Sequence, residues 1–148
     1  MPTLTRRRDP DAHQEAWLIH CGDIHVGTIN KRSGVPGSVD QWGWVCSFYP
    51  ASHRGVHADG TASNFDEDRA AFEAAWRELL PQITATDFDE YRRYRTREVW
   101  KHGMWDAGCK IPTQTTDGRS RCFCGAEIDI AGVERHVYAA HMVEPENA

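Results

Sequence analysis

A run of alternating apolar residues between positions 41 and 49 constrains the fold of this chain more than any other feature. Trp42, Trp44, Cys46 and Phe48 occupy every second position, the period at which side chains of a β-strand point to the same face. Two indole rings and a phenyl ring on a single strand face need a large apolar partner surface. We therefore expect this strand to build the core of a sheet that packs against a helix.

Two further strands are predicted ahead of the aromatic strand. Residues 16–21 are short and apolar, and residues 24–29 alternate in character, with a Gly-Asp turn signal between the two runs. Such a pair of β-rich runs predicts a hairpin. We therefore expect three antiparallel strands, preceded by a polar, arginine-bearing leader over residues 1–15.

Two helices are predicted after the sheet. Ser63 stands three residues before Asp66, and acidic residues fill the turn that follows, a pattern typical of a helix N-terminus. Apolar residues at helical spacing then continue to Pro81. A second helix is expected from Thr86 to about Ala107. The fold class is therefore α+β, with a three-stranded antiparallel sheet packed on one helix and followed by a second helix.

Length and composition fit one such body with a small C-terminal appendix. The chain has 148 residues, of which 40% are hydrophobic and six are tryptophan, and this excludes global disorder. Its net charge of −5 disfavours strong non-specific binding of nucleic acid by the whole chain. Five cysteines without an export signal favour thiols or a metal site over a disulfide framework. With no apolar run near the roughly 20 residues that a bilayer requires, we expect a cytoplasmic protein without membrane contact.

The C-terminal segment carries the pattern that points most directly to chemistry. Cys122 and Cys124 are followed, after eleven residues, by His136 and then by His141. Two thiolates and two imidazoles make a closed, tetrahedral zinc site, and Gly125 lets the backbone turn directly after the second cysteine. We therefore predict a structural zinc ion at these four residues. The alternative is that the cysteines are ordinary small residues and the histidines belong to a helix surface.

This segment, residues 120–142, resembles the two-cysteine, two-histidine zinc finger. It departs from the family in the single residue between its cysteines, where two to four are usual, and in its eleven-residue spacer. The resemblance implies a small module whose fold is stabilised by a bound zinc ion. Residues 127–135 hold three acids and one arginine, so base-specific DNA recognition by this segment is not expected.

The body resembles a second group of proteins. Its segments WLIHCGDIHVGTI, DQWGWVCSFYP and FDEDRAAFEAAWREL are similar to short, uncharacterised bacterial proteins, over residues 16–105. This resemblance implies no activity.

Two other clusters are candidate sites. Arginines interleaved with aromatic residues in the second helix could pair with phosphates and stack on bases. The candidate nucleic-acid-binding residues are Arg92, Arg93, Arg95, Arg97 and Lys101. The alternative is a solvated helix face whose arginines pair with nearby glutamates. His53, His57 and Asp59 lie close together in the sequence and could bind a metal or perform acid–base chemistry, the alternative being a polar loop without such a role.

The sequence predicts five segments: a flexible basic leader (1–15), the α+β body (16–107), a linker (108–120), a zinc-finger-like appendix (121–142) and a tail (143–148). The favoured function is a non-catalytic, zinc-binding regulatory or interaction module that contacts nucleic acid or a protein partner. The alternative is a small metal-dependent enzyme that uses the loop of His53, His57 and Asp59. No small-molecule substrate is indicated, and the tryptophan stripe leaves a homodimer open.

Overall fold

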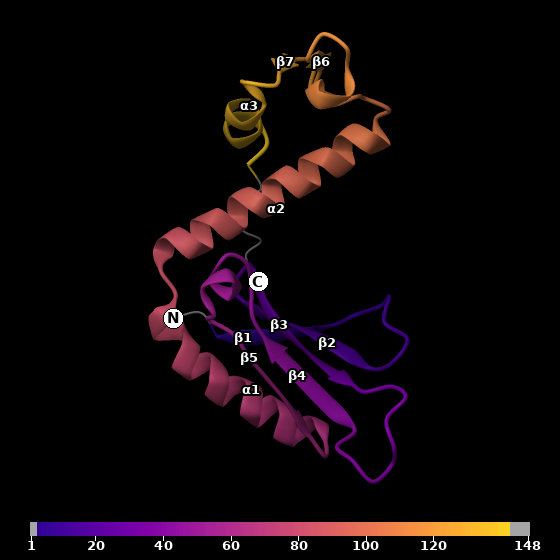
Figure 1. Ribbon diagram of the computed structural model, residues 1–148, viewed down its shortest axis with the longest axis vertical. Helices are drawn as coiled ribbons and strands as arrows, with labels where there is room; N and C mark the ends of the chain where they lie inside the picture. Colours follow the sequence, from indigo (N-terminus) through magenta and orange to yellow (C-terminus); the bar gives the residue numbers. More distant parts are fainter. Residues whose placement is uncertain (1–2, 143–148) are drawn as a thin grey trace. The chain divides into compact units, whose positions relative to one another are not determined.

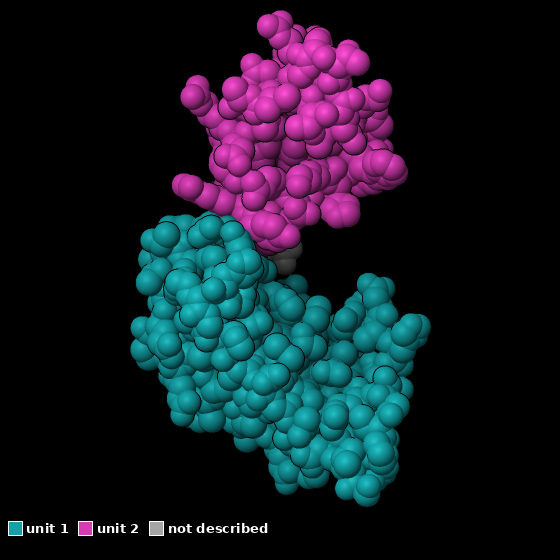
Figure 2. Space-filling model, in the orientation of Figure 1, with its two compact units in different colours: residues 1–91, 145–148 teal, residues 92–144 magenta. Residues whose placement is uncertain are grey.

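The chain divides into two compact units, coloured separately in Figure 2. The computed structural model describes residues 3–142. Within them, the first unit extends to Tyr91 and the second begins at Arg92. The boundary therefore lies inside helix α2 (Ala85–Asp106), whereas the sequence favoured a linker at residues 108–120. The C-terminal part of α2 belongs to the same unit as the cysteine–histidine segment.

The first unit is built on a five-stranded antiparallel sheet (Figure 1). Its strands lie side by side in the order in which they occur in the sequence. The strands are β1 (Leu4–Arg8), β2 (Ala16–Cys21), β3 (Ile24–Lys31), β4 (Trp42–Cys46) and β5 (Ala58–Ala62). Helix α1 (Phe65–Leu79) packs against β3, β4 and β5. The expected α+β class is confirmed, and the expected number of strands is wrong.

The two strands that the sequence pattern missed lie at the edges of the sheet. Strand β1 reads Leu-Thr-Arg-Arg-Arg and falls in the stretch expected to be a flexible leader. Backbone pairing with β2 holds it along its whole length, and the Arg6 guanidinium lies 4.5 Å from the centre of the Trp17 ring. Strand β5 reads Ala-Asp-Gly-Thr-Ala and pairs with β4. Neither strand has the apolar alternation by which strands are predicted.

The aromatic stripe forms the centre of the core, as its period predicted. Trp44, Cys46 and Phe48 are all buried. The Trp44 ring meets the Phe72 ring of α1 edge to face, with the ring centres 6.2 Å apart. Phe48 stacks on Phe88, near the start of α2, at 5.6 Å. The stripe therefore packs on the chain's own helices.

Close contact between the sheet and α1 depends on a glycine in the middle of β3. A Cβ atom on Gly27 would collide with the carbonyl oxygen of Val45 and would lie 2.5 Å from a ring carbon of Phe72. Phe72 is itself 1% exposed, so neither neighbour has room to withdraw. Gly27 is therefore required for the helix to approach the sheet.

Both long helices begin at capping residues that differ from those expected. Asn64, rather than Ser63, caps α1, and its side chain accepts a hydrogen bond from the backbone N–H of Glu67 (2.9 Å). Helix α2 begins at a reciprocal pair, in which Thr84 and Asp87 each accept the other's backbone N–H. The acidic first turns of both helices agree with the favourable interaction between carboxylates and helix N-termini.

The second unit combines part of α2 with three short elements (Figure 1). These are the paired strands β6 (Arg119–Arg121) and β7 (Glu127–Asp129), and helix α3 (Val133–Ala140). A small cluster of five buried residues holds them together: Trp100, Met104, Cys122, Ile128 and Val137. The described residues also contain the 3-10 turns η1 (Ala51–Arg54) and η2 (Leu80–Gln82) in the first unit and η3 (Pro112–Gln114) in the second. No helix in residues 3–142 has the length and apolarity to cross a bilayer.

Candidate metal centre

The second unit brings together the four side chains predicted as zinc ligands. The donor atoms of Cys122, Cys124, His136 and His141 all lie within 4.8 Å of one another. Within the described residues 3–142, this is the one group of at least three histidine, cysteine or acidic side chains that could hold a metal ion. The four ligands come from two places in the chain, the β6–β7 turn and helix α3.

The β6–β7 turn positions the two cysteines. Cys122 directly follows β6, and its carbonyl oxygen accepts a hydrogen bond from the Gly125 N–H (2.8 Å). The N–H of Cys122 in turn donates to the carbonyl of Ala126 (2.8 Å). Gly125 adopts a φ of 97°, a left-handed conformation that favours glycine. The single residue between the cysteines is therefore accommodated by a tight turn with a glycine at its end.

Helix α3 positions the two histidines. His136 lies in the helix and its N–H donates to the Gly132 carbonyl (3.0 Å). His141 ends the helix, and its N–H donates to the carbonyl of Val137 (2.9 Å). Val137 is 2% exposed and anchors α3 in the core of the unit. The helix that carries His136 extends from Val133 to Ala140.

Three of the distances between the donor atoms are close to the edges of a metal tetrahedron. The Sγ of Cys122 lies 3.3 Å from Nε2 of His141, and the Sγ of Cys124 lies 3.5 Å from Nε2 of His136. The two Nε2 atoms are 3.2 Å apart. Zinc bonds of about 2.3 Å to sulfur and about 2.0 Å to nitrogen predict edges of about 3.5 Å (S to N) and about 3.3 Å (N to N). The donor set and its spacing therefore fit a four-coordinate ion such as zinc.

The two histidine rings face each other, and the environment of His141 favours its neutral form. The pKa of His141 lies below its ordinary value, mainly because burial penalises the charged imidazolium and secondly because of the charge of His136. A neutral imidazole keeps the lone pair that a metal needs. The Nε2 atoms of the two rings approach each other to 3.2 Å, as two ligands of one ion would.

Two contacts from α2 support the centre and were not anticipated from the sequence. The indole Nε1–H of Trp100 donates to the Sγ of Cys122 (3.3 Å), and both residues are buried. The Phe123 ring lies against Gly103, where an added Cβ would come within 2.9 Å of it, and its centre is 5.0 Å from the His141 ring. No signal in the sequence links Trp100 to a ligand sulfur.

Three of the five basic residues proposed to bind nucleic acid are engaged inside the second unit. Arg97 forms an ion pair with Glu134 of α3 (3.0 Å), and the Arg93 guanidinium lies 5.6 Å from the Tyr138 ring centre. Lys101 pairs with a glutamate three residues before it (3.4 Å). The two other candidates, Arg92 and Arg95, are half-buried on the same helix. The ion pairs agree with the alternative of a helix face that is neutralised within the chain.

The structure does not assemble the histidine loop into a metal-binding group. His53 lies in η1, where its ring meets Tyr49 edge to face at 5.0 Å. Asp59 lies in β5, and His57 is exposed just before that strand. In residues 3–142 these three side chains form no cluster that could hold an ion. The geometry therefore offers no support for an enzyme built on this loop.

Comparisons of the chain with models of protein families, with curated proteins and with solved structures found no match. The likeness to zinc fingers therefore rests on the ligand cluster and on the order of its elements. Two paired strands followed by a helix, as in β6, β7 and α3, is the order of the ββα zinc finger. The second unit differs from a single finger because α2 contributes to its core.

Proposed function

We propose that this protein is a non-catalytic binding module whose second unit is held together by a structural zinc ion. The observation that carries the proposal is that two cysteine and two histidine donor atoms lie within 4.8 Å of one another, with three of their separations close to the edges of a zinc tetrahedron. With four protein ligands, no coordination position remains for water or a substrate, as a catalytic zinc would require. The ion would therefore stabilise the fold rather than perform chemistry.

The small core of the second unit supports a structural role for the metal. Its cluster has five buried residues, and Cys122 is one of them. Below about 70–80 residues a hydrophobic core alone rarely supplies enough stability, and a structural metal is a common supplement. Binding of zinc to residues that are separated in the unfolded chain adds directly to the free energy of folding.

Metal analysis of the purified protein under reducing conditions tests this role. We expect one zinc per chain and an X-ray absorption spectrum with two sulfur ligands at about 2.3 Å and two nitrogen ligands at about 2.0 Å. His136→Ala and Cys124→Ser should lose the ion. His53→Ala is the matched control, because it removes a histidine from the first unit, and it should retain the ion. Less than about half an equivalent in the wild type contradicts the proposal.

We propose a protein as the partner because the second unit exposes large apolar side chains. Among residues 3–142, six of the nine exposed large hydrophobic residues lie in this unit: Tyr94, Val99, Trp105, Phe123, Ile130 and Met142. Trp105 is 81% exposed. Aromatic residues and methionine are enriched at protein–protein interfaces. The ion pairs of Arg97 and Lys101 leave less positive charge for a nucleic acid.

Two binding measurements separate a protein partner from a nucleic acid. Fluorescence anisotropy with labelled duplex DNA and single-stranded RNA should show no tight binding whose affinity falls steeply between about 50 and 200 mM salt. Such binding, if lost in an Arg93→Ala/Arg97→Ala double variant, would refute the choice of partner. In a two-hybrid screen, Trp105→Ala should lose the interactions that the wild type makes. Val45→Ala is the control and should retain them, because Val45 is exposed on the sheet of the first unit.

A further inference from the structure

We infer that Cys124 is the reactive thiolate of this metal centre, open to attack by soft electrophiles, and that Trp100 protects Cys122 from the same reaction. The inference rests on the proposed zinc site. It adds a modification site and a way of opening the second unit.

The two ligand sulfurs differ first in their accessibility. Cys122 is 2% exposed and belongs to the core of the second unit. Cys124, only two residues later, is exposed. A reagent must reach a thiolate along an open path before it can react, so accessibility directs modification to one cysteine over another.

The sulfurs differ also in their hydrogen bonds. The Nε1–H of Trp100 donates to the Cys122 Sγ at 3.3 Å, and the indole is 3% exposed. An N–H donor withdraws negative charge from a thiolate and lowers its nucleophilicity. Within residues 3–142, the Cys124 Sγ has one polar contact, with the ligand nitrogen of His136 (3.5 Å). Its negative charge would therefore be shared with the metal alone.

The position of Trp100 is enforced by its surroundings. It packs in the same buried cluster as Met104 of α2 and Val137 of α3, so its indole has little freedom to turn away from the sulfur. Cys122 therefore has its thiolate covered and hydrogen-bonded by a fixed ring. Cys124 has neither form of protection.

The reaction expected at Cys124 is addition to an activated carbon–carbon double bond. The sulfur lone pair forms a carbon–sulfur bond, the π electrons move to the neighbouring carbon, and that carbon takes a proton from water. The product is a thioether, which is a weak zinc ligand, so Cys124 leaves the coordination sphere. A single addition would thus remove one of the four ligands on which we propose that the fold of the second unit depends.

N-ethylmaleimide is the probe for this reaction, applied below one equivalent to the full-length chain. Cys109 is replaced by serine beforehand, because it is a partly exposed free thiol outside the ligand set. Cys21 and Cys46 serve as internal standards, since both are buried and burial raises the pKa of Cys46 to about 12. Fragmentation mass spectrometry locates the first adduct, and a chromophoric chelator measures the zinc that is released.

The first adduct should fall on Cys124 with at least about tenfold preference over Cys122, with zinc released in step. Trp100→Phe should reduce this preference several-fold by freeing the Cys122 sulfur from its donor. Met104→Leu alters the same core without touching the hydrogen bond, and it should leave the preference unchanged. Equal labelling of the two cysteines in the wild type overturns the inference, and this result does not depend on whether the Trp100 variant folds.

Zinc content measured before labelling distinguishes the two proposals. A chain that contains no zinc refutes the proposed function and this inference together. A zinc-loaded chain that is labelled equally at Cys122 and Cys124 refutes this inference alone. If Trp100→Phe and Met104→Leu reduce the preference for Cys124 equally, the preference arises from core packing. That result would refute the role of the indole N–H.

Discussion

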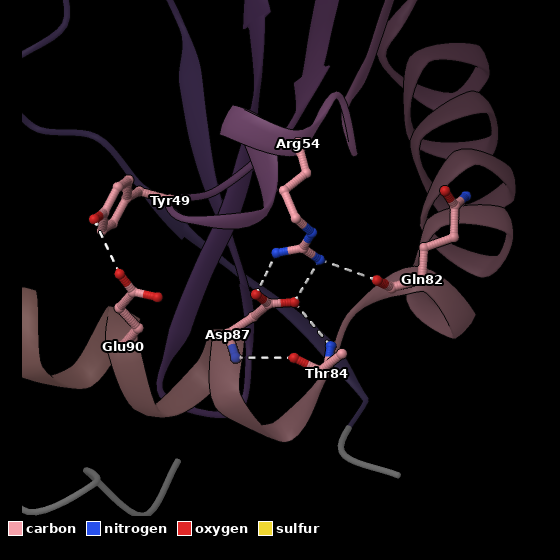
Figure 3. A network of polar contacts seen from close by, with 6 residues as sticks. All are labelled: Tyr49, Arg54, Gln82, Thr84, Asp87 and Glu90. Atoms are coloured by element: carbon pink, nitrogen blue, oxygen red, sulfur yellow. Dashed lines mark hydrogen bonds and ion pairs between the residues drawn. The ribbon is translucent and has the colours of Figure 1, made fainter.

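Arg54 of η1 binds both carboxylate oxygens of Asp87 in the first turn of α2 (Figure 3). One of these contacts measures 2.8 Å, and the same guanidinium donates to the carbonyl of Gln82 (3.2 Å). Asp87 also accepts the N–H of Thr84 at the helix N-terminus (2.9 Å). One buried carboxylate therefore joins the turn after β4 to the start of α2.

The Arg54–Asp87 pair should make the stability of the first unit depend on acid pH. The Arg54 hydrogen bonds lower the pKa of Asp87 to about 2. The pKa of Asp87 is lower in the folded protein than in the unfolded chain. The ionised carboxylate therefore stabilises the fold almost fully above about pH 4, and this stabilisation is lost as the pH falls towards 2. Asp87→Asn should lower the free energy of unfolding at pH 7 by roughly 1–2 kcal/mol, since Arg54 is half exposed and partly screened. Urea unfolding at pH 7, 4 and 3 measures this.

The difference between wild type and Asp87→Asn should shrink by about half at pH 3. Arg69→Ala is the matched control, because Arg69 pairs with Glu73 at 3.9 Å with both side chains exposed, and it should cost less than about 0.5 kcal/mol. A difference that stays constant from pH 7 to pH 3 would contradict the assignment.

Asp68 of α1 should give a pH dependence of the opposite sign. Its side chain is fully buried against the sheet, and its carboxylate oxygens have no hydrogen-bond partner within residues 3–142. Burial, with a smaller effect from Asp40, raises its pKa to about 6. Because the folded state holds the proton more tightly than the unfolded chain, stability is full below about pH 4. It falls as pH rises to 6 and stays low above that.

Asp68→Asn should therefore raise the free energy of unfolding at pH 7.5, by up to about 3 kcal/mol, and should remove the loss of stability between pH 4 and 6. Urea unfolding followed by tryptophan fluorescence measures both effects. Asp66→Asn is the control, because Asp66 is exposed in the same turn and its charge favours the helix N-terminus. If Asp68→Asn were less stable than the wild type at pH 7.5, the prediction would be wrong. The Asp68 carboxylate would then stabilise the folded state.

Gly27→Ala should strongly destabilise the first unit, because the added methyl group meets the Val45 backbone oxygen and the buried Phe72 ring. The sheet and α1 would have to separate locally, at an expected cost of at least about 2 kcal/mol. Gly37→Ala is the matched control, since a Cβ there has no neighbour within 4 Å. Thermal denaturation followed by circular dichroism compares the two variants, and equal melting temperatures would show that the sheet can adjust.

How much of this fold could be predicted depends on whether each element carries its own signal. Trp42 to Phe48 alternate at the period of a strand, and the four proposed zinc ligands form two close pairs of cysteines and histidines, so both features were predicted from local pattern. Strand β1 has only one apolar residue, and its pairing with β2 is a long-range consequence of the fold. The Trp100–Cys122 hydrogen bond joins residues 22 positions apart and has no local signature.

The boundary between the two units was also missed because it depends on long-range contacts that have no local signature in the sequence. Glycines and polar residues made 108–120 resemble a linker, and helix α2 looked like a single element of the body. The buried positions of α2 change partners along the helix, however. Phe88 packs with Phe48 of the first unit, whereas Trp100 and Met104 pack with Cys122. Periodicity identifies the face of a helix that is buried but not the element that covers it.

Metal removal should unfold the second unit and leave the first unit folded. The core of the second unit contains a ligand, Cys122, and the two histidines lie in α3 and at its C-terminal cap, so loss of zinc should remove folding energy from that unit alone. After treatment with a strong chelator, hydrogen exchange should show loss of protection in β6, β7 and α3 and little change in β2, β3 and β4. Added zinc should restore protection. Gly27→Ala provides the reciprocal control, because it should lose hydrogen-exchange protection in the sheet and retain zinc. If chelation of the wild type reduced protection equally in both units, the two units would not be stabilised independently.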